Sequence, residues 1–207
     1  YHRYPIADND SPQLSADRLE YTLGDMRCYS FAGADAIRAF YEDLTVWQDE
    51  AGRPELAFRT LETACAFTAA ALSVSRVYVA DEDRFAMQAL ADLLRDAAGR
   101  KVLTEDDLYQ TEPFVIQQLE ADPVSAAQWR RFRRFCRVER RAEWPEGGIW
   151  YRIPAKLRYI DPLVAGQGRV SRLDGGVRQA QEAFLATDFT CWIGVPEGAG
   201  KENDGKS

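Results

Sequence analysis

The stretch Ser15–Asp25, SADRLEYTLGD, is the part of the sequence from which the fold can best be inferred. Asp17, Tyr21 and Asp25 follow one another at intervals of four residues. On a helix, this spacing places all three on one face, each about one turn from the last. Two carboxylates and a phenol do not form a core stripe, so the face is predicted to line a pocket. A surface helix rich in acids is the alternative.

Helical periodicity continues from this stretch to about residue 140. The clearest pattern follows residue 35, where apolar side chains recur at three- and four-residue steps as far as Trp47. A capping-box pattern at Thr104–Asp107 predicts the start of a short helix. The other helices are predicted at Gln13–Asp25, Asp35–Gln48, Glu55–Val79, Glu82–Ala98, Pro113–Ala121 and Val124–Arg140.

The composition changes at Trp144, where a turn-rich segment is followed by aromatic and β-branched residues. Ile149–Ile160 is predicted to form a strand or hairpin, Val177–Ala186 a helix and Phe189–Val195 a final strand. The fold class is therefore mainly α, with a small β-rich C-terminal element. We expect a helical domain over residues 1–143, a small α+β element over 144–196 and a flexible tail over 197–207.

The overall composition is that of a globular protein, with 46% hydrophobic and 29% charged residues among 207. The net charge of −7 argues against broad binding to nucleic acid or to an anionic membrane. No apolar run is long enough to span a bilayer. The four cysteines are far apart and form no CxxC pair, which predicts reduced thiols, a cytoplasmic protein and no cysteine zinc site.

Ser15–Asp25 resembles the last metal-ligand helix of the HD superfamily of metal-dependent phosphohydrolases, in particular the deoxynucleotide triphosphohydrolase-like members. Asp8–Asp25 and Lys156–Val164 are also similar to segments of uncharacterised bacterial HD-domain proteins. The resemblance implies an HD-domain-like helical bundle. It also implies a divalent metal ion (Mn, Mg, Fe or Ni) and hydrolysis of a small phosphorylated substrate, either a nucleotide or another phosphate ester.

The resemblance also implies roles for four residues of this helix. Asp17 corresponds to the aspartate that completes the metal site, and a carboxylate suits a hard or borderline divalent ion. Tyr21 and Asp25 match positions that face the nucleotide, and Arg18 lies next to the metal ligand. We therefore expect Asp17 to bind metal, and Arg18, Tyr21 and Asp25 to bind substrate. No catalytic residue is assigned.

The sequence departs from the family in its histidines. The other family ligands are histidines and an adjacent His-Asp pair, all N-terminal to the last aspartate. This chain has a single histidine, His2, and no His-Asp pair. Two explanations stay open. The histidine-bearing helices precede Tyr1 in the gene product, so that an N-terminal fragment would be a partner. Alternatively, the domain is a catalytically inactive module that binds a partner or small ligand. His2 itself is either a remnant of the site or a solvated residue.

Basic residues gather at two further places. Seven arginines lie between Arg130 and Arg141, interleaved with aromatic residues. They form either a contact surface for phosphate or nucleic acid or the polar face of an amphipathic helix paired with acids, and the net charge favours the second. Lys156 and Arg158 share one face of a predicted strand, where they would meet an anion or cross-strand acids. Aromatic residues in 149–160 and 189–195 suggest a homodimer.

Overall fold

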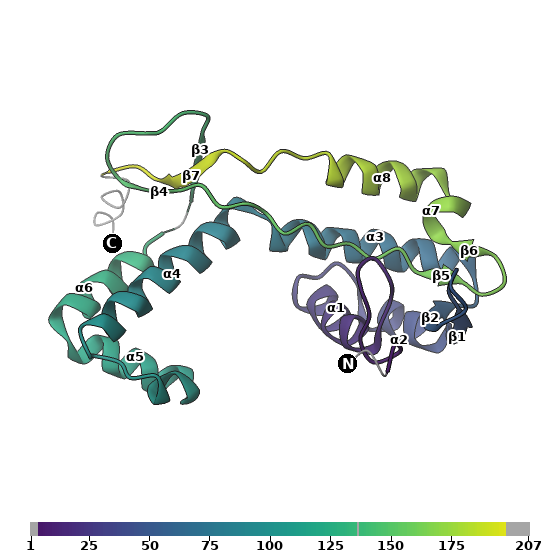
Figure 1. Ribbon diagram of the computed structural model, residues 1–207, viewed down its shortest axis with the longest axis horizontal. Coiled ribbons are helices and arrows are strands. Elements are labelled where there is room, and N and C mark those ends of the chain that lie inside the picture. Colours follow the sequence, from purple (N-terminus) through teal and green to yellow (C-terminus); the bar gives the residue numbers. More distant parts are fainter. Residues whose placement is uncertain (1–3, 136, 198–207) are drawn as a thin grey trace. The chain divides into compact units, whose positions relative to one another are not determined.

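The computed structural model describes residues 4–135 and 137–197, which form eight α-helices, one 3₁₀ helix and seven short strands (Figure 1). About 51% of the described residues are helical, which confirms the mainly α class. The chain divides into two compact units, each made of two separate segments. Unit 1 comprises residues 1–79 and 156–187, and unit 2 comprises residues 80–155 and 188–207. His2 and most of the predicted tail lie outside the described residues.

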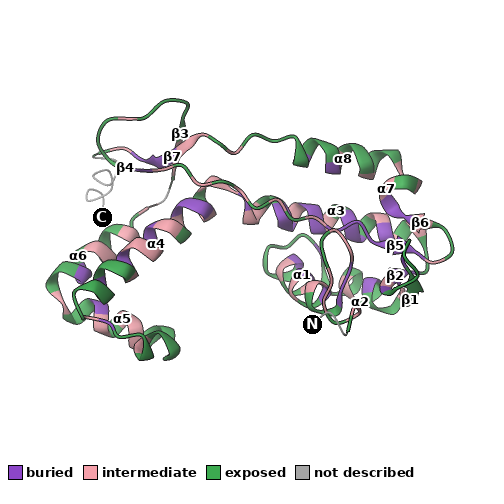
Figure 2. Ribbon diagram, in the orientation of Figure 1, coloured by how far each residue is buried: buried purple, intermediate pink, exposed green. Residues whose placement is uncertain are grey.

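Unit 1 is built around α3, which is the helix with the longest buried stripe in this unit (Figure 2). Ala64, Phe67, Ala71 and Val74 recur along one face of α3 and are all buried. Small alanines on this face allow neighbouring helices to pack closely. The helices of unit 1 are α1 (Ala16–Cys28), α2 (Ala34–Glu42), α3 (Leu61–Tyr78), α7 (Val170–Leu173) and α8 (Gly175–Leu185).

Unit 1 also contains a four-stranded sheet that the sequence patterns did not predict. Its strands, in the order β1-β2-β5-β6, are β1 (Leu44–Gln48), β2 (Pro54–Phe58), β5 (Leu163–Val164) and β6 (Gly168–Arg169). The predicted helix Asp35–Gln48 is wrong beyond Glu42, and Glu55–Val79 is wrong before Leu61. The physical reason is tertiary pairing, because β1 and β2 form an antiparallel hairpin in which every residue of β1 has a partner. Such pairing overrides a helical pattern of apolar residues.

The helices of unit 2 follow the predicted order, with one shorter than expected. The capping box is confirmed, since Thr104 and Asp107 exchange side-chain to backbone hydrogen bonds. The predicted helix Val124–Arg140 is wrong after Phe132, where α6 ends. Arg140 and Arg141 belong instead to a strand that pairs with the C-terminal strand. The helices are α4 (Asp81–Gly99), the 3₁₀ helix η1 (Asp106–Tyr109), α5 (Glu112–Ala121) and α6 (Pro123–Phe132).

A three-stranded antiparallel sheet completes unit 2. Its order is β3-β7-β4, formed by β3 (Glu139–Arg141), β7 (Trp192–Val195) and β4 (Ile149–Tyr151). β7 confirms the predicted C-terminal strand but is shorter. The strand predicted over Ile149–Ile160 is confirmed only for its first three residues, since residues 152–162 have no regular secondary structure. Ile193 and Val195 pack with Phe85 of α4.

No single helix in the described ranges is long and apolar enough to cross a membrane. The α3 and α4 segments meet that test only when they are taken together across the break between them.

Candidate functional site

Asp17 lies in the first turn of α1, which is well anchored at its start. The Ser15 hydroxyl caps the helix by accepting a hydrogen bond from the backbone N–H of Arg18. The Asp17 backbone N–H donates to Ala7 O at 3.1 Å, but its side chain is exposed. Within residues 4–135 and 137–197, the Asp17 carboxylate makes no hydrogen bond or ion pair. A rigid backbone thus presents a carboxylate whose oxygens are all available.

Arg18 has a different environment, because its guanidinium holds the loop that precedes α1. It donates to the Asn9 side chain at 2.8 Å and to the Asn9 carbonyl at 2.9 Å. It also donates to the carbonyl of Gln13. The Asn9 amide in turn donates to Leu14 O at 3.1 Å. Arg18 therefore stabilises the loop, and its predicted contact with substrate stays a prediction.

Asp25 and Tyr21 lie further along α1, and both are half-buried. The Tyr78 hydroxyl, from the end of α3, donates a hydrogen bond to the Asp25 carboxylate. Burial raises the pKa of Tyr78 above its usual value, and the hydrogen bond to Asp25 raises it further. This phenol stays protonated at neutral pH and joins α1 to α3. The substrate-binding roles predicted for Tyr21 and Asp25 stay predictions.

The described side chains do not supply a complete metal centre. No group of three or more histidine, cysteine, aspartate or glutamate side chains in the described ranges is arranged to hold an ion. The predicted site residues of α1 supply only part of the donor set that a divalent ion needs. Asp17 would supply one carboxylate, and further ligands would have to come from residues that the structure does not describe.

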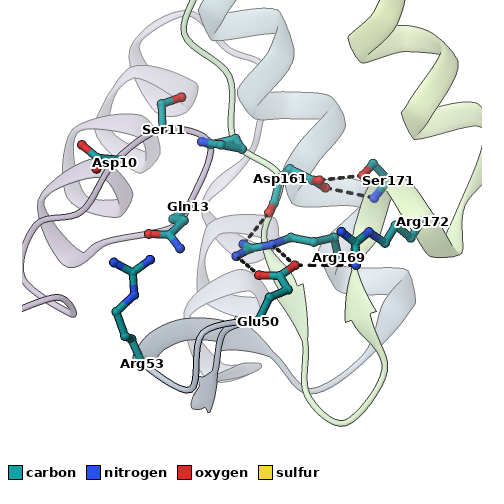
Figure 3. Close-up of a pocket in the computed structure, with 10 residues that line it drawn as sticks. Asp10, Ser11, Gln13, Glu50, Arg53, Asp161, Arg169, Ser171 and Arg172 are labelled. Carbon is teal, nitrogen blue, oxygen red and sulfur yellow. Dashed lines mark hydrogen bonds and ion pairs between the residues drawn. The ribbon is translucent and has the colours of Figure 1, made fainter.

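Unit 1 also contains a polar pocket of about 440 Å³ beside the loop before α1 (Figure 3). The sequence patterns did not identify it, because its residues come from distant segments: the loop before α1, the β1–β2 turn, and residues near β5 and β6. Gln13 and Arg53 lie near one another on one side of the pocket, and Arg169 extends toward Glu50 on the other (Figure 3). The residues that line it are Asp10, Ser11, Pro12, Gln13, Glu50, Arg53, Asp161, Arg169, Ser171 and Arg172.

Arg169 is the best-connected residue of this pocket. It forms two hydrogen bonds to Glu55, at 2.7 and 2.8 Å, and two to Glu50, at 3.1 and 2.9 Å. A fifth goes to the Asp161 carbonyl at 3.0 Å. The five N–H donors of a guanidinium are thus all used. Burial by itself lowers the pKa of Arg169, but the bonds to Glu55 and Glu50 outweigh it, so that the pKa is raised.

The neighbouring acids of the pocket are satisfied in the same way. The hydrogen bonds from Arg169 lower the pKa of Glu50. Asp161 accepts from the backbone N–H of Ser171 at 2.9 Å and from its hydroxyl at 2.6 Å. These contacts hold the wall of the pocket and leave little capacity for a ligand. Arg172 can bind a ligand, because its side chain is 71% exposed and its only ion pair among the described residues, with Glu50, is 3.9 Å long.

Lys156 and Arg158, predicted to share a strand face, are both exposed but lie in a segment without regular secondary structure. Side-chain exposure alternates along this segment only as far as Tyr159, because Ile160 and Asp161 are both buried.

Comparison with known proteins gives no match: no family model, no curated protein and no solved structure is similar to this chain.

Proposed function

We propose that this chain contributes part of the active site of an HD-type, divalent-metal-dependent phosphohydrolase that acts on a nucleotide or another phosphate ester. Asp17 is the metal ligand of this proposal, and Arg18, Tyr21 and Asp25 lie beside the substrate. The observation that supports it best is the Asp17 carboxylate, which lies on an anchored helix start and has no partner among the described residues. Histidine ligands would come from residues outside the described ranges. An HD-domain-like bundle and a cytoplasmic location belong to the same proposal.

A divalent ion, when bound, would polarise a phosphoryl group. The residues of this chain act around it. The Ser15 cap and the Arg18 bonds hold the start of α1, so that the Asp17 carboxylate keeps its position. The Tyr78 hydroxyl donates a hydrogen bond to Asp25, which lies two turns further along the same helix.

The test uses the protein expressed from its full coding sequence. We expect manganese or nickel to bind and to support hydrolysis of p-nitrophenyl phosphate or a deoxynucleoside triphosphate. Asp17→Ala should lower activity by about 100-fold, as is typical when a metal ligand or its support is lost. The matched control is Asp35→Ala, which removes an exposed acid from the first turn of α2. Equal activity of the two variants would refute the role of Asp17.

The second candidate is a non-catalytic helical module that binds a small ligand, and the polar pocket favours it. Arg172 and Arg53 carry exposed guanidinium groups at its mouth, with exposed side-chain fractions of 71% and 61%. If this candidate is correct, Asp17→Ala leaves ligand binding unchanged, whereas Arg172→Gln weakens it. A thermal-shift screen of phosphorylated metabolites on both variants separates the two functions.

A further inference from the structure

Unit 2 carries a cluster of arginines between residues 130 and 141. All seven arginines of this cluster are exposed. Arg140 pairs with Asp81 and Arg141 with Glu139, and Arg134 is engaged as well. In the described part of the chain, no ion pair involves the remaining four, which are Arg130, Arg131, Arg133 and Arg137.

Two acids of α4, Asp92 and Asp96, pair with residues other than these four. Asp92 accepts hydrogen bonds from Gln88 at 2.8 Å and from Arg95 at 3.0 Å. Asp96 accepts from Arg100 and from Gln128, both at 3.0 Å. Between residues 130 and 146 the sequence holds seven arginines and three glutamates. This part of unit 2 is therefore locally cationic, although the whole chain carries −7.

Aromatic side chains lie on the three-stranded sheet that begins at the end of this segment. Trp192 of β7 is paired in register with Arg141 of β3. The guanidinium of Arg141 lies 5.8 Å from the ring centre of Trp150, which is on β4. Trp144 meets Trp192 edge to face at 4.5 Å and is itself 66% exposed. Alternation places Trp192 on the opposite face of β7 from buried Ile193 and Val195.

We propose that the four arginines of unit 2 without an ion pair among the described residues, together with the exposed Trp144, bind single-stranded nucleic acid, and we call these five residues the arginine–tryptophan surface. Guanidinium groups match phosphate oxygens, and exposed indole rings stack on unpaired bases. A duplex offers no unpaired base to Trp144. A membrane-binding helix would expose apolar side chains beside its arginines, but Trp129, Phe132 and Phe135 pack into the clusters of unit 2. These contacts favour a single strand. This binding goes beyond phosphate-ester hydrolysis and does not depend on Asp17.

The test measures fluorescence anisotropy of labelled dT20 and U20 with the full chain. Binding should occur at 50 mM NaCl and weaken steeply as salt rises, because bound arginines release counterions from the phosphates. The two oligonucleotides distinguish DNA from RNA. Lack of binding to both would overturn the proposal. Binding to vesicles containing phosphatidylserine, without binding to either oligonucleotide, would assign the surface to a membrane instead and would also overturn it.

Two matched pairs of variants locate the surface. Arg130→Gln, Arg131→Gln and Arg133→Gln together should weaken binding by at least about tenfold and reduce the salt slope by about 2. The control triple removes the same charge from exposed helix positions of unit 1, at Arg27, Arg38 and Arg76. Trp144→Ala should cost about tenfold through lost stacking, whereas Trp47→Ala, also at an exposed tryptophan, should cost nothing. Equal losses in variant and control would refute the location.

Discussion

Arg169 and Glu55 form a buried ion pair that connects two strands of unit 1 that are not neighbours. Arg169 Nη1 lies 2.7 Å from Glu55 Oε1, and the side chains are only 8% and 2% exposed. β5 lies between their strands, β6 and β2. The same Glu55 oxygen accepts a hydrogen bond from the backbone N–H of Leu14 at 3.0 Å. One carboxylate thus connects the sheet to the segment that leads into α1.

Arg169→Met is expected to destabilise unit 1 by about 3–5 kcal/mol. The change leaves Glu55 buried with the Leu14 N–H but without a countercharge, and an uncompensated buried charge costs far more than a surface pair contributes. Urea unfolding followed by fluorescence checks this, because Trp47 is the tryptophan of unit 1. Arg53→Gln, at a side chain that is 61% exposed, is the control and should change the free energy of unfolding by less than about 1 kcal/mol. Equal effects would contradict the structure.

Tyr78→Phe is expected to change how stability depends on alkaline pH. Burial and the hydrogen bond to Asp25 raise the pKa of Tyr78 in the folded state above its value in the unfolded chain. Its contribution is therefore complete below about pH 10, and it is lost as pH rises above 10 toward the raised folded value. The variant should lose about 1 kcal/mol at pH 7 and show a smaller further loss between pH 10 and 11.

The matched control for this prediction is Tyr41→Phe, at an exposed tyrosine of α2. Melting curves at pH 7, 10 and 11 for the parent protein and both variants provide the measurement. The prediction is contradicted if, above pH 10, the melting temperature of the parent protein falls no more steeply than that of Tyr78→Phe. The pKa of Tyr78 would then not be raised by folding.

Gly194→Ala is expected to disrupt the sheet of unit 2. A Cβ atom at this position of β7 would lie 2.1 Å from Ile149 O and 2.7 Å from the Trp150 ring. Either the strand pairing or the indole must shift, and we expect a loss of at least about 2 kcal/mol. The control Gly24→Ala, in α1, meets no atom within 4 Å and should be neutral or stabilising. Near-ultraviolet circular dichroism of the tryptophans reports the change, and an unaltered spectrum would contradict it.

Asp17→Ala and Arg18→Ala are expected to differ in stability although they are neighbours. The Asp17 carboxylate has no described partner, so its loss should cost less than about 1 kcal/mol, chiefly through the helix dipole. Arg18→Ala removes the bonds to Asn9 and Gln13 and should cost about 2 kcal/mol. Differential scanning calorimetry compares the two. A large loss for Asp17→Ala would mean that its carboxylate has a structural role.

Local signals were sufficient where an element depends mainly on its own residues. The capping box at Thr104 and Asp107 is formed by side chains three residues apart, and the sequence pattern located it correctly. Pro113 lies in the first turn of α5, as the fixed backbone angle of proline predicts. The strands β1 and β2 were missed because their apolar residues are also compatible with helical spacing. Only their pairing with each other decides the conformation.

In the candidate site, too, the sequence determined some features and could not determine others. The four-residue spacing of Asp17, Tyr21 and Asp25 on one helix followed from the sequence alone. It could not show that Asp25 is bound by Tyr78, 53 residues away, or that Arg18 holds the Asn9 loop. Partners of this kind are distant in sequence, and no local pattern encodes them.

The sequence by itself determined the mainly α class, most helix starts and ends, and the placement of an acid, a phenol and a second acid along α1. These features depend on backbone propensities, caps and periodicity within about one turn of chain. Only the tertiary structure decided which polar side chains are already occupied, as in the Arg169–Glu55 pair, and which have no partner among the described residues, as at Asp17 and Arg130. The reason is physical: the availability of a side chain depends on which distant segment packs beside it.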